Sequence, residues 1–261
     1  MIRTLLVLLV LCASIARADD AVLVAQLNAT NTKIKSLVGD IENVTHKHAF
    51  VFSAKGKLYY ERDNNFRMTA NATTNDQPSS DIGSNKDYFW FWIRKLDPQT
   101  MYYCSYRDIN NSGITHSVNP MWFIEGLGVA NIDTTGAKIY RSGQYVAIVR
   151  RIASPQGEDC YKMVYIDPAK PVIAGHRLYS LQKKLLGTAD VQDYYSTNVG
   201  VYIPKKMSII WYGEGIHITW TLSNPQINVS IPVDTWKMPK TSFKVMDMGK
   251  QKVDWRAYEE K

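Results

Sequence analysis

The chain has 261 residues, with 31 Lys and Arg against 24 Asp and Glu and a formal net charge of +7. Two of the positive charges, Arg3 and Arg17, lie in an N-terminal leader, and no basic block is longer than two residues. Because nucleic-acid-binding proteins carry clustered basic residues, this dispersed charge argues against nucleic acid as a partner.

Residues 1–18 have the pattern of a cleaved secretory signal peptide. A positive start, a short apolar run and an A-x-A cleavage site follow one another, at Arg3, Leu5–Leu11 and Ala16-Arg17-Ala18. The apolar run is far shorter than the ~20 residues that cross a bilayer. Leu11 precedes Cys12 where a lipoprotein signal has a small residue, which argues against lipidation at Cys12. We therefore expect cleavage before Asp19 and a periplasmic or otherwise exported protein.

Asp19–Lys35 is predicted to be an N-terminal helix. Apolar residues recur there at helical spacing, namely Leu23, Leu27, Ile34 and Leu37. The run Asn28–Thr32 is poor in helix formers, so packing has to hold this helix in place. Its apolar stripe must therefore lie on another element.

The rest of the chain is predicted to be mostly β. Short turn sequences separate runs rich in β-branched and aromatic residues: Leu58-Tyr59-Tyr60, Tyr145–Ile152, Tyr161–Ile166, Leu178–Leu181, Met207–Tyr212 and Ile216–Leu222. Asn71–Asp81 is expected to be a polar loop without core-forming residues. Many short strands with close turns indicate an antiparallel meander.

The most informative strand is Phe89–Ile93, in which five large apolar side chains stand consecutively. Neighbouring side chains of a strand point to opposite faces. Phe89, Phe91 and Ile93 should therefore face one way, and Trp90 and Trp92 the other. Both faces must be shielded from water, which suggests a core on one side and an apolar cavity on the other.

A short apolar helix is predicted at Met121–Gly128. Pro120 suits its first turn, and Gly128 suits its end. A long antiparallel sheet must curl, and its concave face needs a cover, for which this helix and the N-terminal one are the candidates. The fold class is therefore mainly β with a few α-helices (α+β): a curved antiparallel sheet forming a half-open barrel lidded by short helices. We expect one domain at 19–249 and a charged C-terminal tail at 250–261.

This order of elements resembles the LolA/LolB family of periplasmic lipoprotein carriers, with the related RseB and LppX lipid-binding folds. Four segments carry the resemblance by their order: Gly56–Met68, Gly83–Trp92, Val201-Tyr202-Ile203-Pro204 and Trp236-Lys237-Met238-Pro239. The element GSN-x-x-x-FW-x-W, starting at Gly83, is similar to that of LolA-like exported proteins of a planctomycete type.

The resemblance implies a non-enzymatic carrier that shelters acyl chains in a hydrophobic cavity during outer-membrane lipoprotein sorting. It implies a lipid or an acylated lipoprotein as partner, together with inner- or outer-membrane sorting proteins, no cofactor, and a monomer. The alternative on the same fold is a sensory or structural envelope protein, as in RseB.

The resemblance also suggests site residues. An arginine in the early strand of these carriers holds the lid helices, and Arg62 stands at that position, although Asp63 replaces the expected proline. Arg67 is the alternative. Eight residues could line the acyl-binding cavity: Phe89, Trp90, Phe91, Trp92, Met121, Trp122, Phe123 and Leu127. For each of them, ordinary core packing is the competing interpretation.

Cys104 and Cys160 are the only cysteines after the leader. An oxidising compartment permits a disulfide between them, and the alternative is two separately buried thiols. Neither lies in a zinc or redox motif.

Enzyme signatures are weak. His46-Lys47-His48 has no third ligand nearby, so no metal site is predicted, and the other histidines are isolated. The chain has no G-x-S-x-G or P-loop sequence, and Gly126-Leu127-Gly128 lacks a surrounding βαβ unit. A hydrolase acting on envelope material is therefore only a third alternative.

Overall fold

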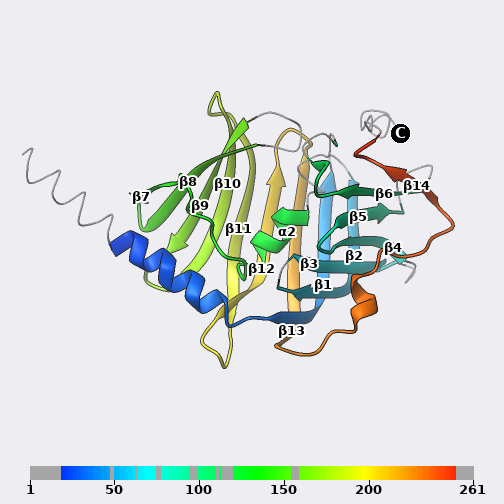
Figure 1. Cartoon of the computed structure of the whole chain (residues 1–261), viewed down its shortest axis with the longest axis horizontal. Helices are drawn as coiled ribbons and strands as arrows, with labels where there is room; N and C mark the ends of the chain where they lie inside the picture. Colours follow the sequence, from blue (N-terminus) through cyan, green and yellow to red (C-terminus); the bar gives the residue numbers. More distant parts are fainter. Residues whose placement is uncertain are drawn as a thin grey trace, which may run out of the picture.

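The computed structural model describes residues 19–47, 50–62, 64–74, 78–94, 99–109, 112, 120–153 and 159–250. Its strands all belong to one sheet (Figure 1). They are β1 Ser36–Lys47, β2 Phe50–Glu61, β3 Asn65–Ala72, β4 Pro78–Ser84, β5 Tyr88–Ile93, β6 Thr100–Ser105, β7 Lys138–Ser142, β8 Tyr145–Ala153, β9 Asp159–Asp167, β10 Val172–Ser180, β11 Leu185–Ser196, β12 Tyr202–Trp211, β13 Ile216–Ile227 and β14 Lys244–Asp247. The helical elements are a helix at 19–31, α2 at Pro120–Gly126 and a 3₁₀ turn, η3, at Val233–Trp236.

The sheet consists of two meanders that meet at β1. Strands β1 to β6 follow one another outward on one side, and β7 to β13 return from the far edge until β13 pairs with β1. The pairs within the meanders are antiparallel, whereas β14 adds to β6 in parallel. Since β7 and β14 stand at opposite ends of the strand order, the sheet is curved but not closed.

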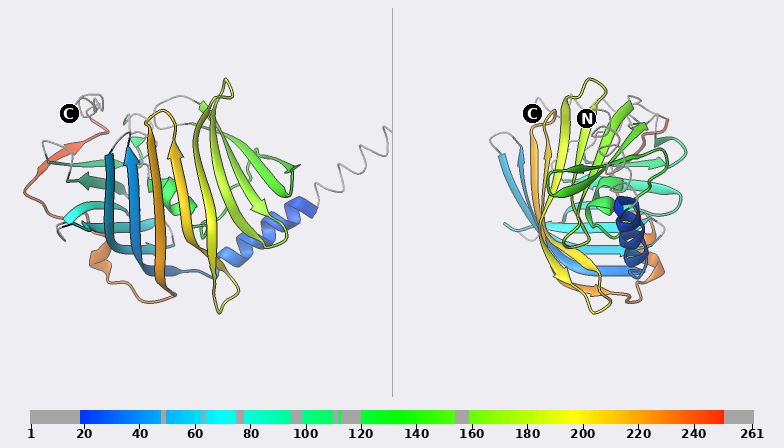
Figure 2. Two further views of the ribbon diagram at one scale, coloured as in Figure 1. Left: turned by 180° about the vertical axis from the view of Figure 1, so that it is seen from behind. Right: turned by 90° about the vertical axis from the view of Figure 1, so that its left-hand side faces the viewer.

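The N-terminal helix and α2 both lie on the concave side of the curved sheet (Figure 2). The N-terminal helix packs Val24 and Leu27 onto β8, β9 and β10 in a small core with Ile148 and Ile166. The larger core lies beneath α2, where Phe123 and two other apolar residues of α2 and the turn after it meet the inner face of the sheet. The predicted fold class, a lidded half-barrel of mainly antiparallel strands, is confirmed.

The N-terminal helix ends earlier than predicted, at residue 31 and not at Lys35. Thr32 turns back to the Ala29 carbonyl through its hydroxyl, and β1 begins at Ser36. Ile34 and Leu37 are fully buried, but they belong to the main core and not to the helix stripe. Their spacing therefore matched a helix by coincidence.

α2 agrees with its prediction. It begins at Pro120, and the Leu127 and Gly128 N–H groups donate to the Phe123 and Glu125 carbonyls at its end. Gly128 has a φ of 65°, the left-handed conformation in which glycine ends helices.

The alternation in β5 is also as predicted. Phe89 and Phe91 are fully buried in the main core, and Ile93 packs against it. Trp90 points to the opposite face, where it too is fully buried. Trp92 meets the Phe243 ring there at 5.1 Å, so the second face of β5 is covered by the chain's own C-terminal segment.

Two further expectations have different outcomes. The polar loop predicted at Asn71–Asp81 is wrong in part, because β4 begins at Pro78 and Asp81 is buried. The leader at 1–18 and the tail from residue 251 onward lie outside the described residues.

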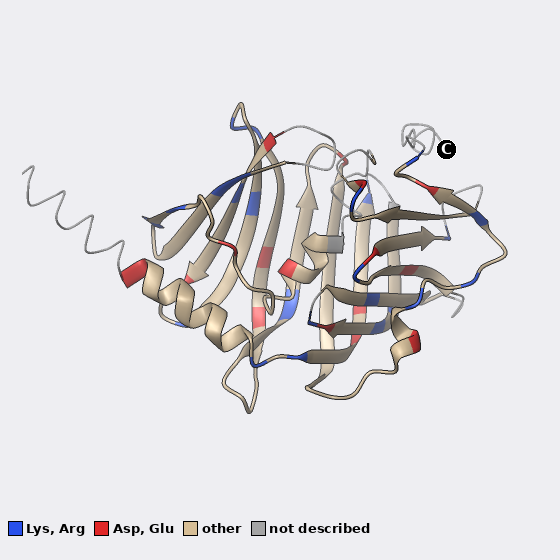
Figure 3. Cartoon of the chain, in the orientation of Figure 1, with Lys and Arg blue, Asp and Glu red and all other residues tan. Residues whose placement is uncertain are grey.

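The helices within the described ranges are all too short or too polar to cross a bilayer. Lys and Arg are interleaved with Asp and Glu over many strands of the described sheet (Figure 3).

Candidate functional site

The helices and the segment that follows α2 form one layer over the concave face, here called the cover: the helix at 19–31, α2, and residues 127–133. Arg62, directly after β2, joins the end of the N-terminal helix to the segment that follows α2. Its Nε donates to the Ile34 carbonyl at 3.0 Å, and its Nη2 donates to the Val129 carbonyl at 3.3 Å. Nη2 also donates to the carbonyl of Asn31, the last helical residue. Carbonyls at a helix C-terminus lack intrahelical partners and favour a cation, so Arg62 suits this position.

Two asparagines of the N-terminal helix make further contacts within the cover. The Asn28 side chain donates to the Ile132 carbonyl at 2.9 Å and accepts from the Ile132 N–H at 2.7 Å. The Asn31 amide donates to the Ala130 carbonyl at 3.3 Å. These contacts explain the poor helix formers at 28–32: the side chains there bind the neighbouring segment. The lid-holding role predicted for Arg62 thus has a matching set of contacts.

Arg67, the alternative, lies on the other face of the sheet. It forms a two-point ion pair with Asp81, at 3.2 Å from Nε and 2.7 Å from Nη2. The Trp90 indole donates to the same carboxylate at 3.2 Å, and Arg67 Nη1 donates to the Thr235 carbonyl in η3 at 3.1 Å. Arg67 therefore holds η3 and not the cover.

The eight predicted cavity residues divide between the two faces. Phe89 and Phe91 from β5 meet side chains of the cover in the main core, and Phe123 stacks on Phe66 at 5.9 Å. Those that meet on the concave side are Phe89, Phe91, Met121, Trp122, Phe123 and Leu127, whereas Trp90 and Trp92 are on the convex side. In the structure they pack against one another and against neighbouring core residues, and their role as an acyl-binding surface stays a prediction.

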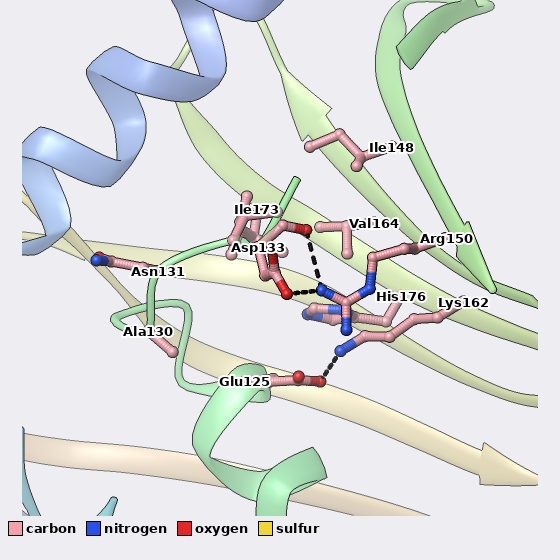
Figure 4. A pocket seen from close by; sticks show the side chains of 11 residues that line it. Glu125, Ala130, Asn131, Asp133, Ile148, Arg150, Lys162, Val164, Ile173 and His176 are labelled. Carbon is pink, nitrogen blue, oxygen red and sulfur yellow. Dashed lines mark hydrogen bonds and ion pairs between the residues drawn. The ribbon is translucent and has the colours of Figure 1, made fainter. Parts of the chain in front are cut away.

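A separate polar cavity of about 80 Å³ lies at the edge of the cover (Figure 4). Its charged lining was missed from the sequence, because the residues come from four distant segments. Glu125 is on α2, Asp133 follows α2, Arg150 is on β8 and Lys162 is on β9. Two further polar side chains line it: Asn131 after α2, and His176 on β10, which as an isolated histidine gave no signal in the sequence.

Each cation of this cavity is paired with a carboxylate of the cover. Lys162 pairs with Glu125, and Arg150 pairs with Asp133. Lys162 also lies 5.6 Å from the centre of a Trp122 ring, within reach of a cation–π contact. His176 is 2% exposed, and neither of its ring nitrogens has a hydrogen bond of normal geometry within the described part of the chain, although the Glu125 backbone lies near enough to raise its pKa. Burial, with a smaller contribution from the Lys162 charge, lowers the pKa of His176 to about 4.

Cys104 and Cys160 are both buried, and neither forms a disulfide within the described residues. They lie on β6 and β9, which are far apart in the strand order, and no disulfide joins them. The bridge considered from the sequence is therefore not formed, and the alternative of two buried thiols describes them. Burial raises the pKa of the Cys104 thiol to about 11, which makes it unreactive.

Groups of three or more potential metal ligands are absent from the described ranges. The arrangement thus offers a cover held by polar contacts and apolar packing over the concave face, with a charged cavity at its edge.

Comparison with solved structures defines the class of this fold. A LolA superfamily protein from Nitrosomonas europaea superposes with a TM-score of 0.51 at 9% identity, over 82% of this chain and 97% of its own. A DUF1329 family protein from Desulfovibrio piger gives 0.51 at 11% identity, over 85% and 97%. An outer membrane lipoprotein-sorting protein domain from Vibrio parahaemolyticus gives 0.47 at 12% identity, over 81% and 94%. No family model and no curated protein matches the sequence. The protein thus has a LolA-like fold.

Proposed function

We propose that this protein is an exported, non-enzymatic carrier that shelters the acyl chains of a lipid or an acylated lipoprotein, and that it acts in outer-membrane lipoprotein sorting. The observation that carries the proposal is the attachment of the cover. Arg62 bonds to three carbonyls of the cover and of the strand connection below it, and Asn28 adds two more bonds. Because the strands pair with one another and not with the cover, a cover held by these bonds and by apolar packing can lift without unfolding the sheet beneath it.

The physical need for such a carrier is clear. An acyl chain in water costs about 0.8 kcal/mol for each exposed CH₂ group, so transfer between membranes requires an apolar shelter. When the cover lifts, the side chains of Phe123 and Leu127 leave the main core, and the apolar inner face of the sheet becomes available to an acyl chain. Met121 and the aromatic residues can adapt to irregular chains.

A second function on the same fold is a sensory or structural envelope protein. The observation that favours it is the filling of the interior, where Phe123 stacks on Phe66 and Leu127 is 1% exposed. In this case the outer surface of the cover would contact a protein partner, and the interior would carry nothing.

Native mass spectrometry of gently purified protein separates the two functions. For a carrier we expect an additional mass corresponding to a co-purified lipid, and this mass disappears after delipidation with organic solvent. Protein of the unmodified mass only, both after purification from envelope fractions and after incubation with lipid vesicles, would contradict the carrier function. N-terminal sequencing of the exported protein should begin at Asp19, and a start at Met1 would contradict cleavage of the leader.

A further inference from the structure

The polar cavity at the edge of the cover has its opposite charges on different layers of the molecule. Both carboxylates, Glu125 and Asp133, belong to the cover, whereas both cations, Arg150 and Lys162, belong to the sheet. Figure 4 shows the two ion pairs meeting between these layers. A movement that lifts the cover therefore removes both negative charges and leaves two cations side by side on β8 and β9.

His176 adds an independent observation at the same place. Its imidazole lines the cavity, is 2% exposed, and makes no hydrogen bond of normal geometry within the described ranges, with only the Glu125 backbone close by. Leaving a buried polar group without a good partner is unfavourable, and native proteins rarely keep one without a reason. A neutral imidazole has one N–H group, from which a bound anion could accept a hydrogen bond.

Apolar side chains border these polar groups. Ile148, Val164 and Ile173 line the same cavity, and all three belong to the small core beneath the N-terminal helix. A ligand with an anionic end and an apolar chain matches this combination of two cations, one donor and an aliphatic wall.

We propose that the cavity binds the anionic head group of an acyl lipid, a carboxylate or a phosphate, and that Glu125 and Asp133 occupy this position in the closed protein. This proposal rests on the carrier function and adds the class of ligand. Binding is an exchange of partners. The head group pairs with Lys162 and Arg150 and accepts a hydrogen bond from His176, and the two cover carboxylates move into solvent. Neither Lys162 nor Arg150 can pair fully with the head group and with its cover carboxylate at the same time. Binding of the head group and opening of the cover are therefore coupled.

α2 strengthens this coupling. Trp122 and Glu125 are three residues apart and lie on one side of the helix, and both contact Lys162. Displacement of α2 thus frees Lys162 from its carboxylate and its aromatic neighbour together.

The test compares palmitate and 1-hexadecanol, which have chains of the same length and differ in the head group, and adds a short-chain phospholipid as a phosphate probe. Binding of palmitate, of the neutral 1-hexadecanol and of dihexanoyl phosphatidylglycerol is measured by calorimetry on the purified protein and its variants. We expect an anionic ligand to bind about tenfold or more tightly than the alcohol. The R150M/K162M double variant should lose this preference. A preference for palmitate identifies a carboxylate, and binding of the phosphatidylglycerol identifies a phosphate.

A variant that removes the competing carboxylates gives the opposite result. The E125Q/D133N variant should keep the preference and bind the anionic ligand about tenfold more tightly, and binding of 1-hexadecanol should strengthen as well, because the two ion pairs no longer hold the cover on the sheet. Lys205→Met serves as the control, because Lys205 pairs with Asp193 at 3.0 Å on the exposed part of the sheet, away from this cavity. Its substitution removes one lysine charge and one ion pair and should leave the preference unchanged.

The outcomes separate this inference from the carrier function. Equal binding of palmitate and 1-hexadecanol by the unmodified protein, or a preference that survives in R150M/K162M, overturns the head-group site and leaves the carrier function standing. Binding of none of the three ligands overturns both. Circular dichroism and thermal unfolding of each variant establish that lost binding does not reflect a lost fold.

Discussion

The side chain of Asn28 pairs with the backbone of Ile132 in both directions, donating at 2.9 Å and accepting at 2.7 Å. These residues are 104 positions apart in the sequence. One lies in the N-terminal helix and the other in the segment that leads from α2 to β7. Two separate pieces of the cover are therefore joined through one amide group, as neighbouring strands are joined through peptide groups.

Asn28→Ala should detach these pieces locally and leave the sheet folded. It removes two part-buried hydrogen bonds and leaves the Ile132 N–H and carbonyl without their partner, at a cost of about 1–3 kcal/mol. Hydrogen exchange should accelerate at residues 129–132 and in the helix at 19–31, with protection retained in β1 and β13. Asn65→Ala is the control, since the Asn65 amide donates to Glu61 at 3.0 Å within a hairpin and does not touch the cover. Equal exchange in both variants would show that Asn28 does not hold the cover.

Arg62→Met should loosen the cover as a whole and speed the uptake of a fluorescent fatty acid. The substitution keeps an unbranched side chain and removes every donor to Asn31, Ile34 and Val129. Arg62→Lys should restore the slow uptake only in part, because a single ammonium cannot reproduce the spread of guanidinium donors.

Arg94→Met is the matched control for Arg62. Arg94 also donates from Nε to a backbone carbonyl, that of Pro78 at 2.9 Å, but it contacts no residue of the cover. Its substitution should leave uptake unchanged. The same rate in the Arg62 and Arg94 variants would contradict the lid-holding role of Arg62, whatever the rate in the unmodified protein.

The alternation of side chains along strands, and the proline and glycine at the ends of α2, made much of this fold predictable. The two faces of Phe89–Ile93 followed from the two-residue period of a strand, and the limits of α2 followed from Pro120 and Gly128. The helix at 19–31 was predicted too long, because Ile34 continued its periodicity although it belongs to another part of the core. Periodicity does not show which partner a side chain will meet.

The charged cavity could not be found in this way. Glu125 and Lys162 are 37 positions apart, and each looks like an ordinary surface charge in its own segment. Their pairing arises only because β9 passes beneath the end of α2 in the curved sheet. Arg62 was recognised because a resemblance pointed to it, and only the three-dimensional contacts separate it from Arg67 on the opposite face.

Gly83→Ala should destabilise the protein by about 1–3 kcal/mol through overpacking. A Cβ at this position would lie 2.3 Å from the ring of Trp90, which is fully buried and bonded to Asp81. The indole would have to move and stretch that hydrogen bond. Urea unfolding followed by tryptophan fluorescence measures the loss. Gly213→Ala is the control, because no atom lies within 4 Å of a Cβ there, and a comparable loss in this variant would rule out the packing explanation.

His176 should make the folded protein sensitive to mild acid. Burial lowers its pKa to about 4, and the Lys162 charge on β9 and the Arg177 charge on its own strand act in the same direction, whereas Glu125 on α2 opposes them. The unfolded chain has an ordinary histidine pKa of about 6.5, so the unfolded state takes up the proton first as the pH falls. The stabilisation from a neutral His176 is therefore complete above about pH 6.5 and decreases between about pH 6.5 and 4, by roughly 3 kcal/mol in total.

Comparison of the unmodified protein with His176→Phe isolates this effect from the carboxylates, which titrate in both. The free energy of urea unfolding should fall more steeply with decreasing pH in the unmodified protein, and the difference between the two should grow from pH 7 to pH 4. His46→Phe, at an exposed position in β1, should keep the slope of the unmodified protein. Parallel pH profiles for the unmodified protein and His176→Phe would mean that the imidazole already gains or loses its proton equally in both states, and thus that it is not buried without a partner.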